Sequence, residues 1–327
     1  DATLREEHPL AGIDEIADEH CFVAGLRRLC VDQRADRHCQ FEIVGVAANV
    51  AGIVPGHRVA VFGIGGIGVN ALQAARILGA EQIVAIDIAD ARLEKALEPI
   101  RDRYDLVIAN GENAARGKGL DRRSYRLLRE AGVDLVSLGN HAWDHKEVYA
   151  LLESEPVVRP LNYPPGTPGK GFWRLEVGGE SLLFVQVMGR IFMDPLDDPF
   201  RALDRLLEEE KADYVLVEVH AEATSEKMAL AHYLDGRASA VLGTHTHVPT
   251  LDATRLPKGT LYQTDVGMTG TYHSIIGGEV ETFLARFLTG RPQPFRAAQG
   301  KARLHATELV FEGGRPVAIS PYVWEEP

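Results

Sequence analysis

Cysteine is scarce in this sequence, and the few cysteines are clustered. There are three among 327 residues, and all lie within the first 39 positions, which is too few for the disulfide framework of a small secreted domain. Cys21, Cys30 and Cys39 lack a paired C-x-x-C spacing, so no structural zinc site is expected there. The sequence has no run of 18 apolar residues and begins unlike a signal peptide. We therefore expect a cytoplasmic protein without a membrane-spanning helix.

Positive charge is also in short supply. Lysine and arginine number 35 against 47 acidic residues, which gives a net charge of -12. This balance argues against a nucleic-acid polymer or an anionic membrane as the main partner. A small phosphoester or nucleotide substrate remains compatible, since bound cations reverse the local field. The 45% hydrophobic content is typical of a globular protein. The length of 327 residues allows one large or two ordinary domains, and a homo-oligomer is possible.

Apolar strand patterns alternate with helical patterns from about residue 54 onwards. This β-α-β order predicts parallel strands joined by right-handed crossovers. The predicted strands are 58–62, 82–88, 105–109, 134–138, 214–219, 238–242 and 260–264, with a hairpin of 173–177 and 181–187 and closing strands at 305–311 and 318–323. The predicted helices are 69–78, 91–103, 121–131, 146–153, 200–211, 224–233 and 279–288.

Polar groups follow several of these strands directly. His245 and His247 come just after strand 238–242, and in an extended chain residues at i and i+2 point the same way. Glu112, Asn140 and His220 follow three other strands. Open α/β sheets bind their ligands at the carboxyl ends of the strands. The pattern therefore predicts a metal site along that edge.

A glycine-rich turn precedes this region. Gly63, Gly65 and Gly68 form a G-x-G-x-x-G turn between a strand and a helix, and Asp87 follows 19 residues after Gly68. This is the context of a dinucleotide-binding fingerprint, in which the acid holds the ribose hydroxyls. The segment from about Val44 to Lys95, most clearly its stretch Val54–Asn70, resembles the cofactor-domain entry of zinc-dependent medium-chain alcohol dehydrogenases. No second nucleotide-binding half, catalytic zinc set or substrate domain follows, so we favour a retained scaffold that does not use NAD.

A second resemblance covers most of residues 97–300. It rests on seven stretches in order: Asp105–Ala115, Leu138–Asp144, Pro160–Gly169, Met188–Phe200, Val219–Lys227, Gly243–Val248 and Thr264–Gly270. These stretches resemble the YmdB-type branch of the calcineurin-like metallophosphoesterases. The resemblance implies an α/β fold with a β-sandwich flanked by helices, here preceded by a Rossmann-like βαβ segment. We expect three parts: an N-terminal segment 1–45, the Rossmann-like segment 46–95 and a metallophosphoesterase domain 96–327.

The resemblance also implies the activity. It predicts a metal-dependent phosphodiesterase or phosphatase that hydrolyses phosphoesters, cyclic nucleotides of the 2′,3′ type above all. Two divalent transition-metal ions sharing a hydroxide would act on the phosphorus. Oxygen and imidazole ligands suit iron, manganese or zinc better than metals that prefer thiolates.

Individual roles follow from the same resemblance. Glu112 would bridge the two metals; Asn140, His220 and His245 would hold one of them. His247 would hold the other, with Glu112 and one further acid. His141 would stabilise the transition state or protonate the leaving oxygen, work that imidazole suits near neutral pH. Asn113 is expected to orient the phosphate or a ligand, and Asp265 to fix an imidazole from behind.

The family's first strand ends in Gly-Asp, and that aspartate is a metal ligand, but this sequence departs from the pattern. The strand 58–62 ends in Gly63-Ile64 instead. Strand 82–88 directly precedes helix 91–103, so it could take the first-strand position and bring Asp87, or less readily Asp90, to the metal. Asp87 then has two possible roles, as the residue that binds the ribose of a dinucleotide or as a metal ligand, and we assign it to the metal. Two alternatives stay open: an NAD-binding oxidoreductase using the Gly63–Gly68 turn, and a catalytically impaired metal-binding protein. A natural fusion and a composite sequence also both remain open.

Overall fold

The computed structural model describes residues 84–87, 96–97, 100–115 and 117–327. The chain divides between Ala80 and Glu81, and all described residues belong to the unit Glu81–Pro327. The glycine turn with Gly63, Gly65 and Gly68 lies outside the described residues, as do the three cysteines and the predicted strand 58–62. Most of the predicted helix 91–103 lies outside them too, and its described end, Arg101–Arg103, is a short 3-10 helix.

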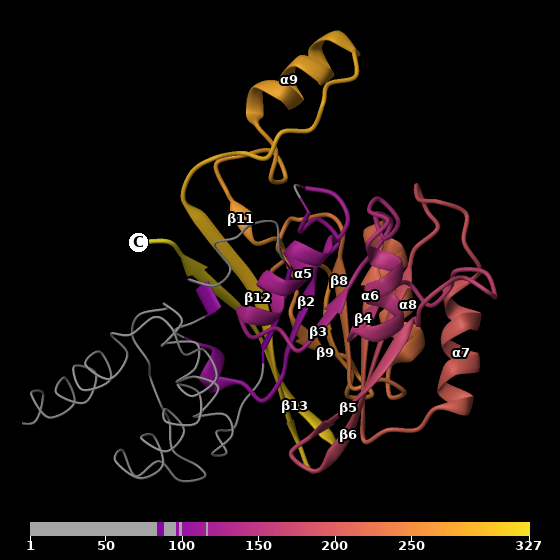
Figure 1. Ribbon diagram of the computed structural model, residues 1–327. Coiled ribbons are helices and arrows are strands. Elements are labelled where there is room, and N and C mark those ends of the chain that lie inside the picture. Colours follow the sequence, from indigo (N-terminus) through magenta and orange to yellow (C-terminus); the bar gives the residue numbers. More distant parts are fainter. Residues whose placement is uncertain (1–83, 88–95, 98–99, 116) are drawn as a thin grey trace, which may run out of the picture. The chain divides into compact units, whose positions relative to one another are not determined.

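Two β-sheets form the centre of the described unit (Figure 1). The first has the order β11-β12-β1-β2-β3-β4, with β13 paired to β12; the second has the order β5-β6-β7-β8-β10-β9. The strands of the first are β1 (Val84–Asp87), β2 (Val107–Asn110), β3 (Leu135–Ser137), β4 (Val157–Val158), β11 (Gly270–Thr271), β12 (Ala302–Glu312) and β13 (Arg315–Glu325). Those of the second are β5 (Phe172–Val177), β6 (Glu180–Met188), β7 (Tyr214–His220), β8 (Ala240–Thr244), β9 (Thr254–Arg255) and β10 (Leu261–Gln263).

The middle of each sheet is parallel. Strands β1 to β4 run parallel to one another, as do β6, β7, β8 and β10. Strand β1 lies between β12 and β2, and Asp87 stands opposite Asn110 in the β1–β2 register. The strand that precedes helix 91–103 in sequence therefore occupies a central position in the first sheet, and Asp87 is at its carboxyl end.

The two sheets pack face to face through a buried apolar layer. Ile108 and Leu135 of the first sheet meet Phe184, Leu216 and Leu242 of the second. Strand β7 is buried along its whole length, which explains its nearly unbroken apolar sequence, because a strand covered on both faces has no solvent side.

Helices cover the outer faces of both sheets, which gives four layers in all. Helices α5 (Arg122–Glu130) and α6 (Val148–Ser154) pack on the first sheet, and α7 (Pro199–Glu209) and α8 (Thr224–Leu234) on the second. The start of α7 shows why the sequence folds this way. Asp198 accepts hydrogen bonds from the backbone of Phe200 and Arg201, and Pro199 stands in the first turn, where its missing N–H costs nothing.

The predicted β-sandwich flanked by helices is confirmed. The predicted strands and helices that fall within 105–327 lie within a few residues of their predicted bounds, and the hairpin β5–β6 turns at Gly178-Gly179 as expected; the predicted helix 69–78 lies outside the described residues. Helix α9 (Val280–Thr289) differs from the others because it projects from the body and buries none of its residues (Figure 1). Among the described residues, no helix has the length and apolar character needed to cross a bilayer.

Candidate metal centre

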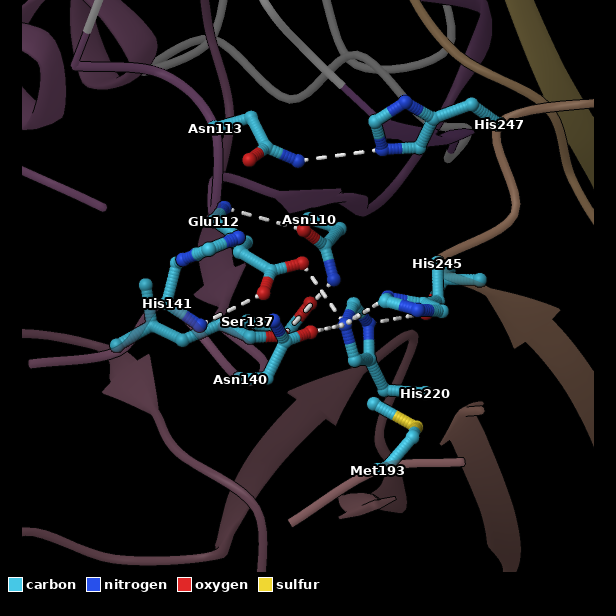
Figure 2. Close-up of polar contacts among 12 residues, drawn as sticks. Asn110, Glu112, Asn113, Ser137, Asn140, His141, Met193, His220, His245 and His247 are labelled. Atoms are coloured by element: carbon cyan, nitrogen blue, oxygen red, sulfur yellow. Dashed lines mark hydrogen bonds and ion pairs between the residues drawn. The ribbon is translucent and has the colours of Figure 1, made fainter. Parts of the chain in front are cut away.

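Four predicted side chains converge where the parallel strands end (Figure 2). His220 is the last residue of β7, His245 follows β8, Asn140 follows β3 and Glu112 follows β2. The Nε2 atom of His220 lies 2.8 Å from Glu112 Oε2, 3.0 Å from Asn140 Oδ1 and 3.1 Å from His245 Nδ1. The sequence therefore identified groups that the fold brings together from four separate segments.

The far side of the His220 ring determines where its proton lies. Its Nδ1 atom is 2.9 Å from Thr244 Oγ1, and that hydroxyl donates at 2.8 Å to Glu218 Oε1. Because the single hydroxyl hydrogen is directed to Glu218, Nδ1 of His220 must be the donor to Thr244. In the neutral ring, Nε2 then presents a lone pair toward Glu112 and Asn140.

His245 also directs a ring nitrogen without hydrogen at the place where the four groups converge. Its Nε2 atom lies 3.1 Å from Glu222 Oε2, a carboxylate that can only accept when ionised. The Nδ1 atom that faces His220 is therefore the unprotonated one. Burial and the neighbouring His220 lower the pKa of His245 to about 3, so the ring is neutral near pH 7.

These contacts test whether the residues fit a metal ion. Three groups that offer lone pairs, Glu112, His220 and His245, place their atoms within 4.8 Å of one another, and the Asn140 amide oxygen joins them. Such acceptors repel each other unless a proton or a cation lies between them. Mixed oxygen and imidazole ligands of this kind suit a divalent transition metal. The residues present therefore fit the implied ion.

Glu112 is held firmly in its charged form. Burial raises the pKa of this carboxyl, but when the His220 ring is protonated its charge and hydrogen bond, together with the backbone N–H of His141, outweigh burial and bring the pKa down to about 2. When His220 is neutral, with a lone pair on Nε2, a cation between the two groups would take the place of that proton. Its own N–H donates to Asn110 Oδ1 at 3.1 Å. Gly139 makes room for this packing, because a Cβ there would lie 2.4 Å from His220 Nε2 and 2.7 Å from Glu112 Cδ.

The expectation that His245 and His247 point the same way from an extended chain is wrong. Strand β8 ends at Thr244, and both histidines have left-handed backbone, with φ of 92° and 63°. His247 lies apart from the four converging side chains in Figure 2: its Nε2 atom is 3.2 Å from Asn113 Nδ2, and its Nδ1 atom is 3.2 Å from the carbonyl of Ile276. His247 and Asn113 thus form a second polar group beside the first.

His141 lies beside the four converging groups, and its ring makes a separate contact. Its Nδ1 atom is 3.1 Å from Asp144 Oδ2, while its backbone N–H donates to Glu112. A carboxylate on Nδ1 fixes the orientation of the ring and leaves Nε2 as the atom able to exchange a proton with another molecule.

Asp265 supports the site, but not through an imidazole as expected. Its Oδ2 atom accepts from Lys227 at 2.8 Å and from the backbone and hydroxyl of Thr246 at 3.2 and 2.5 Å. Thr246 separates the two histidines in sequence, so Asp265 fixes the peptide between the rings. The ion pair of Asp265 with Lys227 is almost fully buried on both sides.

The sequence patterns did not identify four residues that support the candidate metal centre through contacts with its side chains or backbone: Glu218, Thr244, Glu222 and Lys227. One signal was available: Glu218 interrupts the otherwise apolar strand Tyr214–Val219, and a charged residue in a fully buried strand needs partners. Its partners come from four other strands or strand ends, so their identity could not be deduced from local pattern.

Comparison with known proteins finds a family model that covers the candidate metal centre, together with similar proteins. The model of the family described as YmdB-like protein matches residues 84–320. The 2′,3′-cyclic-nucleotide 2′-phosphodiesterase of Bacillus subtilis is 51% identical over 216 residues, 65% of this chain and 82% of the relative. A hypothetical protein from Thermus thermophilus, of known crystal structure, is 91% identical, with a TM-score of 0.73, covering 75% of this chain and all of the other.

A shorter match concerns a different class of enzyme. Geraniol dehydrogenase of Castellaniella defragrans is 48% identical over 54 residues, which is 16% of this chain and 14% of the dehydrogenase. The chain thus also contains a short stretch similar to alcohol dehydrogenases. The length of the stretch is that of a βαβ unit and falls far short of a complete dehydrogenase.

Proposed function

We propose that this chain, which belongs to the YmdB-like family, hydrolyses small phosphodiesters, specifically 2′,3′-cyclic nucleotides. The observation that carries the proposal is the convergence of Glu112 Oε2, Asn140 Oδ1, His220 Nε2 and His245 Nδ1 on one place. The specific substrate is supported by the name of the Bacillus subtilis relative, which is half identical in sequence.

The proposal assigns a ligand role to residues of both polar groups. Glu112, Asn140, His220 and His245 would hold one divalent ion; His247 would hold a second one together with Glu112. Iron, manganese and zinc are the metals that this donor set favours. When bound, a pair of such ions supplies an activated water and neutralises charge on the phosphate. Asn113, 3.2 Å from the His247 ring, is suited to orient a phosphate oxygen.

His141 is the proposed proton donor. Asp144 holds its Nδ1 atom, so Nε2 is the atom from which a proton can pass to the leaving ribose oxygen. Breaking the bond between phosphorus and O2′ leaves the phosphate on O3′, so the expected product is a nucleoside 3′-monophosphate. General acid catalysis by one side chain is typically worth 10²- to 10⁴-fold in rate.

The experiment is hydrolysis of 2′,3′-cyclic AMP by the full chain supplied with manganese, followed by phosphorus NMR. We expect one product, the 3′-monophosphate. His141→Ala is expected to lower kcat by about 10²- to 10⁴-fold while leaving the bound metal unchanged, whereas His245→Ala is expected to lower both. Metal-loaded wild-type protein that leaves the cyclic nucleotide intact would contradict the proposal and favour a catalytically impaired metal-binding protein.

Asp87 is the proposed replacement for the missing first-strand aspartate. The support is its backbone position: it ends β1, opposite Asn110, at the edge where the other ligands follow their strands. Asp87→Asn is expected to reduce the metal content from two ions per chain to one, because a carboxylate ligand is lost. The matched control is Asp90→Asn, which should keep both ions. Two ions in the Asp87 variant would end this assignment.

The oxidoreductase alternative makes a different prediction. A nucleotide site at Gly63–Gly68 would bind NADH whether or not metal is present. We expect a flat fluorescence titration of the full chain with NADH. Saturable binding would show that the dehydrogenase-like stretch still holds a cofactor, and it would return Asp87 to the ribose.

A further inference from the structure

We propose that Glu218 and Thr244 are positioning residues that keep the Nε2 atom of His220 free of hydrogen and directed at the metal. The inference rests on the assignment of His220 as a ligand in the proposed function. Neither residue contacts the place where the ligand atoms converge; both act through the opposite side of the His220 ring.

Glu218 lies between the two sheets, where burial of a charged group is unfavourable unless hydrogen bonds compensate for the lost water. Only 6% of it is exposed. Its Oε1 atom accepts from Asn110 Nδ2 at 2.7 Å, Gln186 Nε2 at 2.8 Å and Thr244 Oγ1 at 2.8 Å, while Ser137 Oγ donates to Oε2. Within the described part of the chain these hydrogen bonds all come from neutral donors, so no cation neutralises the carboxylate.

This arrangement fixes the direction of the Thr244 hydroxyl. The carboxylate offers only acceptor positions, so the hydrogen of Thr244 must point to it. The lone pairs of the same oxygen then face His220 Nδ1 at 2.9 Å. A donor is needed at that ring atom, and the Nδ1–H tautomer supplies it.

The opposite tautomer would place a hydrogen where the ligand atoms meet. With hydrogen on Nε2, His220 would donate to Glu112 Oε2 at 2.8 Å and could not bind a metal. The Nδ1 atom would then face the Thr244 oxygen with a lone pair, and the hydroxyl would have to turn away from Glu218. The buried carboxylate thus biases the ring toward the metal-binding form. Partners of this kind behind a ligand are typically worth 10- to 100-fold in metal affinity.

A competing explanation is that Glu218 merely connects the two sheets. It does join them, since Asn110 and Ser137 belong to the first sheet and Gln186 to the second. A purely structural role predicts that changes at Thr244 alter stability alone. The positioning role predicts that metal affinity depends on the hydroxyl itself, whichever side chain carries it.

The test compares Thr244→Val with Thr244→Ser in the full chain. Valine keeps the shape of threonine and removes the hydroxyl, while serine restores it. Zinc(II) affinity is measured by isothermal titration calorimetry, and thermal unfolding in the presence of a chelator is recorded for each protein. We expect Thr244→Val to bind zinc 10- to 100-fold more weakly, and Thr244→Ser to bind it nearly as tightly as the wild type.

A spectroscopic readout reports on the ring directly. In zinc-loaded protein labelled with ¹⁵N-histidine, the hydrogen-bonded Nδ1–H of His220 should give a slowly exchanging downfield proton signal. We expect it in the wild type and in Thr244→Ser. The signal should be lost or fast-exchanging in Thr244→Val, and absent in His220→Asn, which assigns it.

The zinc affinities and the NMR signal of the Thr244 variants either support the positioning role or contradict it. Equal zinc affinity in wild type and Thr244→Val, or a persistent Nδ1–H signal in that variant, would overturn the inference. If Thr244→Val does not fold, Thr244→Ala takes its place in both measurements. The proposed function can fail separately: zinc binding with the expected variant pattern, but no hydrolysis of the cyclic nucleotide, would leave the positioning role intact.

Discussion

At the scale of single residues, the chemical types of the proposed ligands were predictable from the sequence, and the directions of their side chains were not. Glu112, Asn140, His220 and His245 were recognisable because acid, amide and imidazole groups follow buried strands. The positive φ of His245 and His247 was not recognisable, since a non-glycine residue adopts that backbone only under tertiary constraint. Between the two histidines, Thr246 is hydrogen-bonded to the buried Asp265–Lys227 pair.

Gly139 carries a prediction at this scale. A Cβ at this position would overlap His220 Nε2 and Glu112 Cδ, at 2.4 and 2.7 Å, so Gly139→Ala must push both ligands apart. We expect metal affinity to fall at least about 10-fold, as for other losses of ligand orientation. Calorimetric titration with zinc measures it.

Gly166→Ala is the control for this variant. Gly166 has left-handed backbone, φ 88°, and an added Cβ would meet no atom within 4 Å. The control should therefore lose some stability from backbone strain and keep its metal affinity. Equal affinity in Gly139→Ala and wild type would show that the ligands tolerate the displacement.

At the scale of elements, α8 connects the outer helical layer to the loop that carries His245 and His247, two of the proposed ligands. Lys227 of α8 reaches Asp265 and Thr246 at 2.8 and 3.0 Å, and both members of the ion pair are about 1% exposed. Sequence patterns predicted the helix over 224–233 but not this inward lysine, because a charged residue in an amphipathic helix usually marks the solvent side. Local pattern cannot reveal a partner 38 positions away.

Breaking this pair should destabilise the protein strongly. Lys227→Met leaves the Asp265 carboxylate buried without its cation, and such losses cost about 3–5 kcal/mol in the free energy of unfolding. Chemical unfolding followed by circular dichroism measures it. Adding Asp265→Asn should recover part of the loss, because the orphaned charge disappears.

The half-exposed pair of Arg174 with Glu210 provides the comparison. Arg174→Met should change the free energy of unfolding by no more than about 1 kcal/mol, since water screens exposed pairs. A similar small effect for Lys227→Met would mean that the buried pair contributes little and that the loop is held by other contacts.

At the scale of the whole molecule, the apolar interior between the two sheets contains a buried polar group, Glu218 with its hydrogen-bond donors. The inner layer of Phe184, Leu216 and Leu242 is what the nearly unbroken apolar strands predict. Near the carboxyl ends of the strands it gives way to Glu218 and its donors, which link both sheets to the candidate metal centre. The order of the strands, with β1 between β12 and β2, depends on pairings between residues more than 200 positions apart in the described part of the chain, which the local sequence pattern does not reveal.

The proposed activity depends on the binding of a metal ion by Glu112, Asn140, His220 and His245 together. The measurement that tests it most directly is a crystal structure of the zinc-loaded chain with anomalous diffraction recorded at the zinc edge. We expect an anomalous peak about 2.0–2.2 Å from the ring nitrogens and oxygens of these residues. Saturating zinc with no peak among these four side chains would contradict it.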